Sequence, residues 1–138
     1  MHNSKPGKLL RGTLYLDFVI TLAFGLYSFF HPYQTFGTVV AINDYAGPAM
    51  QSVLGALSVM YVLVGLSCLI VTQSVGKTAC WFGLLMVLRH SWVGINGYQR
   101  IGAPWLIGDP WSDIIIHALF VSAYGLGVCL TVRAKMAG

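Results

Sequence analysis

The segment Pro48–Thr72 reads PAMQSVLGALSVMYVLVGLSCLIVT and contains no charged residue. A helix needs about 20 mainly apolar residues to cross the hydrocarbon core of a bilayer. This segment is long enough, and proline at its start suits the first turn of a helix. It therefore predicts a transmembrane helix.

Further apolar segments of similar length lie on both sides of this helix. The first of them ends before His31 and Pro32, because proline cannot continue a helix and restricts the residue before it. The last begins at Pro110, where Asp109 is a candidate cap. The sequence predicts an all-α, four-transmembrane-helix bundle that forms a single integral membrane domain over residues 1–138. The predicted helices are about 9–30, 48–72, 79–98 and 110–132.

The composition favours a membrane protein over a soluble one. Hydrophobic residues make up 57% of the chain and charged residues 9%, whereas soluble domains carry about 25% charged residues. A soluble fold of this size cannot hide so much apolar surface. The formal net charge of +4 comes from scattered residues at predicted helix ends. The lipid bilayer is therefore the expected partner, and nucleic acid is not.

The distribution of basic residues predicts the orientation of the bundle. One side of the membrane would hold Lys5, Lys8, Arg11, Lys77, Arg133 and Lys135. The other side would hold Arg100, together with Asp44 and Asp109. Cytoplasmic loops are enriched in Lys and Arg. We therefore expect both termini of this multi-pass protein on the cytoplasmic side.

Ionisable residues within predicted spans are candidates for a functional site, because burying them in lipid is costly. Arg89 lies near the middle of the third span and needs a carboxylate or a polar cavity. Asp17, roughly 9 Å inside the cytoplasmic edge of the first span, is one candidate partner, and Asp113 is the other. A purely structural Arg89–Asp17 pair is an equally open interpretation, because polar groups also hold membrane helices together.

Asp113 and His117 are four residues apart, so they share one face of the fourth helix. A carboxylate one turn from an imidazole can fix its tautomer and raise its basicity. Tyr124 continues the same face. The alternative is a capping aspartate and a histidine that bonds across helices. Asp113, His117, Arg89 and Asp17 are thus the candidate acid–base residues.

His90 and His117 fall at comparable depths on two helices that we expect to be neighbours. This arrangement permits a haem held by two histidines or a zinc site completed by Asp113. Hydrogen bonding between helices explains the same residues, so we predict no cofactor and no metal. The candidate ligand-binding residues are His90, Asn96, Tyr124, Trp92 and Trp111.

The second predicted helix carries small or polar residues at nearly helical spacing. They are Gln51, Gly55, Ser58, Val62 and Gly65. Stripes of small residues let membrane helices approach closely. This stripe therefore predicts a packing face.

The layout resembles that of the DoxX-like group of small four-helix membrane proteins. The similar features are Arg11, Gly25, Leu26, Pro32, Gly37, Gly55, Gly65, Arg89 and Asp113. The resemblance covers most of the chain as architecture and implies a small membrane protein of a group that includes redox-associated subunits. It transfers no catalytic role. Sterol isomerase-like membrane proteins share the number of helices, but no motif connects them with this chain.

Two main functions fit these features. The first is a protein that binds a lipid-soluble small molecule within the bundle, or an accessory subunit of a larger membrane complex or homo-oligomer. The alternative is an enzyme that isomerises, cyclises or opens the epoxide of an isoprenoid- or sterol-like substrate by acid–base chemistry. A proton-coupled transporter is the third. The chain contains no P-loop, GxSxG, HExxH or CxxC pattern, so soluble-type nucleotide or hydrolase sites are not expected.

Overall fold

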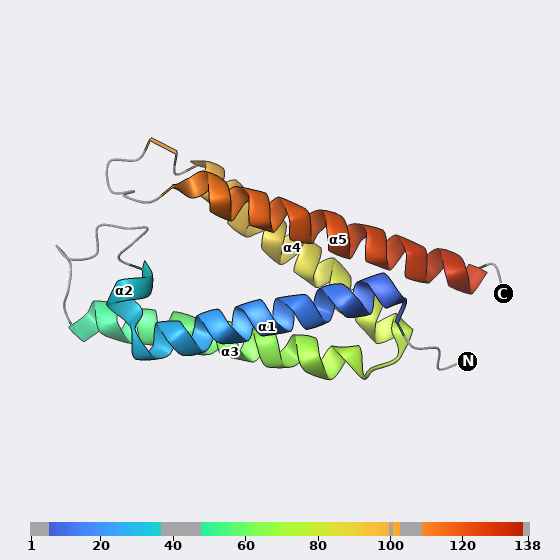
Figure 1. Cartoon of the computed structure of the whole chain (residues 1–138), viewed down its shortest axis with the longest axis horizontal. Coiled ribbons are helices and arrows are strands. Elements are labelled where there is room, and N and C mark those ends of the chain that lie inside the picture. The colour runs from blue at the N-terminus through green and yellow to red at the C-terminus, as the bar shows by residue number, and fades with distance from the viewer. Residues whose placement is uncertain (1–5, 37–47, 100, 103–108, 137–138) are drawn as a thin grey trace.

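A computed structural model describes residues 6–36, 48–99, 101–102 and 109–136. The protein is all-α, and four long helices pack as a bundle together with one short helix (Figure 1). The helices are α1 (Lys8–Phe30), α2 (Pro32–Phe36), α3 (Pro48–Thr72), α4 (Gly76–Gln99) and α5 (Pro110–Met136).

Prolines stand at the first positions of helices, where the missing backbone N–H of proline is tolerated. Helix α1 ends at Phe30, where the His31 backbone N–H donates to the Tyr27 carbonyl oxygen (2.9 Å). The short helix α2, which the sequence did not predict, begins at Pro32 directly afterwards. Helix α5 begins at Pro110, and the Trp111 N–H donates to Asp109 Oδ1 (3.1 Å). The predicted cap at Asp109 is therefore confirmed.

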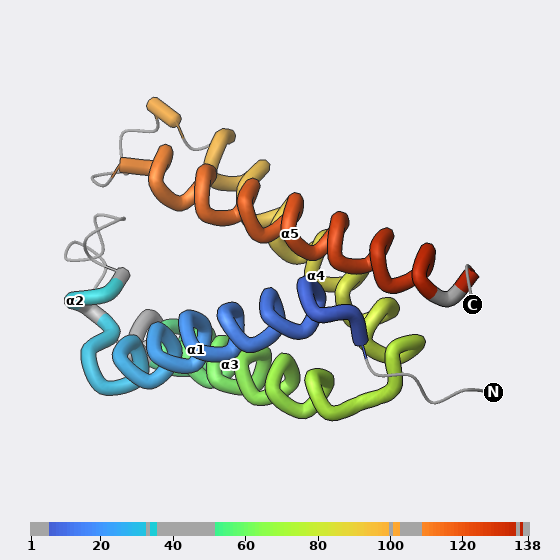
Figure 2. Tube along the Cα trace, turned by 45° about the vertical axis from the view of Figure 1, so that its right-hand side comes forward, coloured from blue at the N-terminus to red at the C-terminus, as the bar shows by residue number. Residues whose placement is uncertain are grey.

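The bundle consists of two helical hairpins. Helix α1 packs along α3, and α4 packs along α5 (Figure 2). The contact between the hairpins is mainly between α1 and α5. The hairpins lie close together at the end that holds Lys8 and Met136, and they diverge toward the opposite end. The molecule thus has the shape of a V.

Glycines allow the close approach of α1 and α3. A Cβ atom at Gly25 would lie 2.8 Å from the Val62 backbone nitrogen, and one at Gly65 would lie 3.0 Å from the Leu22 nitrogen. Ser58 is fully buried. The predicted packing face is therefore confirmed at Ser58 and Gly65. It is wrong at Gly55, where an added Cβ would meet no described atom within 4 Å.

The two hairpins meet at the closed end of the V around Leu10 of α1. A Cβ at Gly127 of α5 would lie 3.0 Å from the backbone of Leu10. Leu10, Leu14 and Val128 form part of the buried core there. The Gly7 N–H donates to Thr131 Oγ1 (3.1 Å), which ties the start of α1 to α5. This contact fixes the spacing of α1 and α5 next to the polar cluster described below.

Within the part of the chain that the structure describes, three helical segments are long and apolar enough to cross a membrane: Lys8–Phe30, Ser52–Thr72 and Pro110–Ala134. Many large apolar side chains on the helices point away from the bundle. Such a surface suits lipid and not water. The chain is thus a small polytopic membrane protein.

Apart from Arg89 in the middle of α4, the Lys and Arg residues of the described helices lie at the closed end of the V. Lys8 and Arg11 stand at the start of α1, Lys77 at the start of α4, and Arg133 near the end of α5 (Figure 1). Lys5, Asp44 and Arg100, on which the predicted orientation also depends, lie outside the described residues.

Candidate functional site

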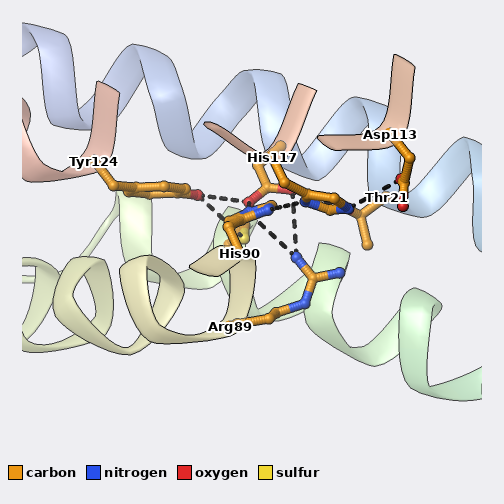
Figure 3. Close-up of polar contacts among 8 residues, drawn as sticks. Thr21, Arg89, His90, Asp113, His117 and Tyr124 are labelled. Carbon is orange, nitrogen blue, oxygen red and sulfur yellow. Dashed lines mark hydrogen bonds and ion pairs between the residues drawn. The ribbon is translucent and has the colours of Figure 1, made fainter. Parts of the chain in front are cut away.

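Asp17 of α1 is the centre of a buried polar cluster (Figure 3). Asp17 is only 1% exposed. Tyr124 of α5 donates its hydroxyl proton to Asp17 Oδ2 (2.8 Å), and His90 Nε2 of α4 lies 3.0 Å from the same oxygen. Thr21, one turn along α1, donates to Asp17 Oδ1 (2.6 Å). A single carboxylate therefore joins α1, α4 and α5.

Arg89 approaches this carboxylate from the edge of the cluster. Its Nη1 atom lies 4.0 Å from Asp17 Oδ1 and 3.3 Å from His90 Nε2. The guanidinium also lies over the ring of Tyr61 of α3, 5.8 Å from its centroid. The Arg89 side chain is 23% exposed, against 1% for Asp17. Of the two carboxylates that the sequence left open, Asp17 is the partner of Arg89.

A row of imidazoles continues from Asp17 toward the open end of the V. His90 Nδ1 lies 2.7 Å from His117 Nδ1 of α5. His117 Nε2 lies 3.2 Å from Asp113 Oδ1, so the pair predicted from the i, i+4 spacing is present. The side chain of Asp113 is 57% exposed. The row thus connects a buried carboxylate with an exposed one.

Aromatic rings hold His90 in this row. The His90 imidazole stacks on Phe120, with centroids 4.7 Å apart and an angle of 10° between the planes. Tyr124 lies beyond it, 5.9 Å from His90. Stacking on rings that are themselves buried limits rotation of the imidazole and keeps both its nitrogens on their partners.

The arrangement does not fit a haem held by His90 and His117. An iron between two axial imidazoles keeps their ligating nitrogens on opposite faces of the porphyrin. Here the two Nδ1 atoms are in direct hydrogen-bond contact at 2.7 Å. Among the residues that the structure describes, no group of three or more His, Cys, Asp or Glu is arranged to hold a metal ion.

An open groove of about 500 Å³ runs between α4 and α5 beside the cluster. Most of its lining is apolar, and at Gly94 an added Cβ would lie 3.7 Å from Cβ of His117 on the facing helix. His90 is one of the lining residues. The others include Ser91, Gly94, Ile114, Ala118 and Ser122. A second, smaller groove of about 260 Å³ lies between α1 and α5 and includes Thr13 and Phe120.

Other residues singled out in the sequence lie away from the cluster. Trp92 and Trp111 are largely exposed on the outside of the bundle. Asn96 donates from Nδ2 to the Trp92 carbonyl oxygen of its own helix (2.8 Å) and does not extend the hydrogen bonds of Arg89. Tyr124, by contrast, lies in the cluster itself.

Three members of the cluster were missed in the sequence. Thr21 stands four residues after Asp17, a spacing that could have identified it. Cys68 lies in an apolar segment with no local pattern to single it out, but its Sγ lies 3.9 Å from the Tyr124 hydroxyl. No sequence pattern identified Tyr61, because its contact with Arg89 depends on how far α3 is rotated about its axis relative to α1.

Comparisons of the chain with protein-family models, with curated proteins and with solved structures gave no match.

Proposed function

We propose that all four long helices of this chain span the membrane, with both termini on the cytoplasmic side. Helix α4 is less apolar than its neighbours because it carries Arg89 and His90, but these side chains face the cluster. Its other faces present large apolar groups, and Leu88 is 67% exposed. The basic residues at the closed end of the V support the cytoplasmic orientation.

We propose that the protein binds a lipid-soluble small molecule in the groove between α4 and α5. The observation that carries this proposal is the position of His90, which both lines the groove and contacts Asp17 and His117. A groove of about 500 Å³ falls within the range of small-molecule sites. Its apolar walls suit an isoprenoid or sterol skeleton, and the hydroxyl groups of Ser91 and Ser122 in its lining suit a hydroxyl or carbonyl group.

Photo-crosslinking would test this proposal. The purified protein in phosphatidylcholine nanodiscs would be irradiated with a diazirine-bearing sterol and, separately, with a diazirine-bearing isoprenoid alcohol. We expect labelling of groove residues such as Ile95 and Ile114. Ala118→Trp fills the groove and should abolish that labelling. Leu126→Trp, on an exposed face of the same helix, is the matched control and should not.

Labelling of the groove that survives Ala118→Trp would contradict the assignment of this site. Labelling that is spread evenly over lipid-facing residues would favour the accessory-subunit function. In that case the protein should instead be recovered with a larger membrane complex or as a homo-oligomer. The resemblance to DoxX-like proteins is compatible with either outcome, since it concerns the architecture alone.

An acid–base enzyme acting on a lipophilic substrate is the second candidate. The specific observation in its favour is the Asp17–His90 contact at 3.0 Å beside the groove, because a carboxylate orients and strengthens a histidine base. In this function His90 would contact the substrate, Arg89 would stabilise developing negative charge, and Asp113 would exchange protons with water. Unchanged turnover of isoprenoid or sterol epoxides in folded His90→Gln protein would exclude it.

A further inference from the structure

Two hydrogen bonds and one ion pair join Asp17 to Asp113 in a continuous row. They connect Asp17 Oδ2 with His90 Nε2 (3.0 Å), His90 Nδ1 with His117 Nδ1 (2.7 Å), and His117 Nε2 with Asp113 Oδ1 (3.2 Å). Each contact needs one proton, and each imidazole nitrogen holds at most one. The row is therefore complete when it holds three protons.

The same three protons can occupy the row in several ways. In one arrangement Asp113 is protonated, Asp17 is ionised and both imidazoles are neutral. If each proton moves across its own contact, Asp17 becomes protonated and Asp113 ionised. Between these limits both carboxylates are ionised and the pair of imidazoles carries one positive charge. No bond between heavy atoms forms or breaks, and no other reactant is needed.

Every one of these arrangements is electrically neutral once Arg89 is included. The row carries a net charge of −1 in each case, and the guanidinium adds +1 from 4.0 Å away. Low net charge matters here because uncompensated charge within a membrane is costly. Arg89 Nη1 also lies 3.3 Å from His90 Nε2 and can donate to that nitrogen only after it has released its proton. The charge of Arg89 favours the arrangements in which Asp17 is ionised, whereas its hydrogen bond to His90 Nε2 is available only when Asp17 holds the proton.

The surroundings of the row come from all four long helices. The charged or titratable described groups that contact its members are Arg89 of α4, Tyr124 of α5 and, through these two, Tyr61 and Cys68 of α3. Thr21 of α1 contributes a neutral hydroxyl. Arg89 is thus the one fixed charge among these neighbours.

We infer that Asp17, His90, His117 and Asp113 form a proton relay that connects the buried carboxylate with the water at the Pro110 end of α5. The exposed Asp113 collects or releases the proton, and the two imidazoles pass it on. The relay needs no molecule in the α4–α5 groove, so it stands whether or not the proposed ligand binds there. If a ligand does bind beside His90, the relay is the path by which it exchanges protons with water.

Nuclear magnetic resonance of protein labelled with ¹⁵N-histidine, in phosphatidylcholine nanodiscs without added ligand, would test the relay. A coupling between the Nδ1 atoms of His90 and His117 should report their shared proton. The proton that His90 shares with His117 should exchange with water although His90 is only 2% exposed. The shift returns each proton to its own contact, so this exchange also needs the partly exposed His117 ring to turn over and swap its two protons between His90 and Asp113. In His117→Asn the amide still offers a hydrogen bond but does not relay protons, so exchange should slow by roughly tenfold or more.

A second test variant and its matched control lie at the same end of the bundle. Asp113→Asn removes the outer member of the relay and should slow exchange at His90, by less than His117→Asn because His117 is itself partly exposed. Asp109→Asn changes a nearby exposed carboxylate outside the row and should leave the rate unchanged. Wild-type exchange rates in both His117→Asn and Asp113→Asn, with backbone spectra unchanged, would overturn the inference. If His117→Asn does not fold, the exposed Asp113→Asn change decides alone.

Discussion

Asp17 is one carboxylate that receives hydrogen bonds from side chains of three helices. Its donors are Thr21 from its own helix, His90 from α4 and Tyr124 from α5. Among the residues that the structure describes, no buried side-chain nitrogen or oxygen lacks a hydrogen-bond partner. Networks that are fully satisfied in this way fix one arrangement of the surrounding helices.

Asp17→Ala should strongly destabilise the protein, because it leaves His90 and Tyr124 without their acceptor and Arg89 without its counter-ion. Removing one member of a buried ionic network costs about 3–5 kcal/mol in the free energy of unfolding. Unfolding by detergent titration, followed by circular dichroism, measures this change. Asp109→Ala alters an exposed carboxylate and should cost far less. Equal losses in the two variants would show that Asp17 does not hold the bundle together.

Tyr124→Phe should have a smaller effect, since it removes only the hydrogen bond to Asp17 and keeps the buried ring. Hydrogen bonds between membrane helices contribute about 1 kcal/mol, and the same titration would measure this loss. Tyr98→Phe, at an exposed tyrosine of α4, is the control. A loss as large as that of Asp17→Ala would mean that the hydroxyl, and not the carboxylate, organises the network.

The sequence predicted the members of this site better than their contacts. The cost of charge in lipid identified Asp17 and Arg89, and helical spacing paired Asp113 with His117. The contact between His90 and Asp17 depends on how far α4 is rotated about its axis. No local pattern determines that rotation, because the apolar residues of a membrane helix surround it on all sides. For the same reason the sequence did not show that Asn96, a candidate ligand-binding residue, bonds to the backbone of its own helix.

At the scale of helices, the α1–α3 hairpin depends on backbones that nearly touch at Gly25 and Gly65. Gly25→Ala should lower the free energy of unfolding by about 1–3 kcal/mol, because the new methyl group meets backbone that cannot move aside easily. Gly12→Ala on the same helix meets nothing within 4 Å. This change should be neutral or stabilising by up to about 1 kcal/mol, the difference in helix propensity.

Comparing the thermal unfolding of these two variants would isolate the effect of the interface from that of the helix. Equal stability in both would contradict the close packing.

The lengths of the helices themselves were predictable from apolar runs and prolines. The packing face was predictable only in part, since Gly55 belongs to the same stripe as Gly65 but faces open space. The spacing of small residues along α3 does not show at which residue the neighbouring helix α1 begins to diverge from it.

At the scale of the whole molecule, the V shape requires that the α3–α4 turn and the start of α5 lie at opposite ends. A topology with four spans therefore predicts that Ser74→Cys and Ser112→Cys react with a membrane-impermeant maleimide from opposite sides of sealed vesicles. The experiment would use protein in which Cys129, the exposed native cysteine, is replaced by serine. Reaction of both positions from the same side would mean that α4 does not cross the membrane.

The order of the helices along the chain also has a consequence for how the protein is made. A ribosome completes α1 and α3 before it reaches His90 and Tyr124, so the first hairpin enters the bilayer while Asp17 still lacks both partners. Until the second hairpin arrives, this newly made half carries an unpaired acid toward lipid. The carboxylate that stabilises the finished bundle is therefore uncompensated in every unfinished one, because His90, Tyr124 and Arg89 all come from the second hairpin.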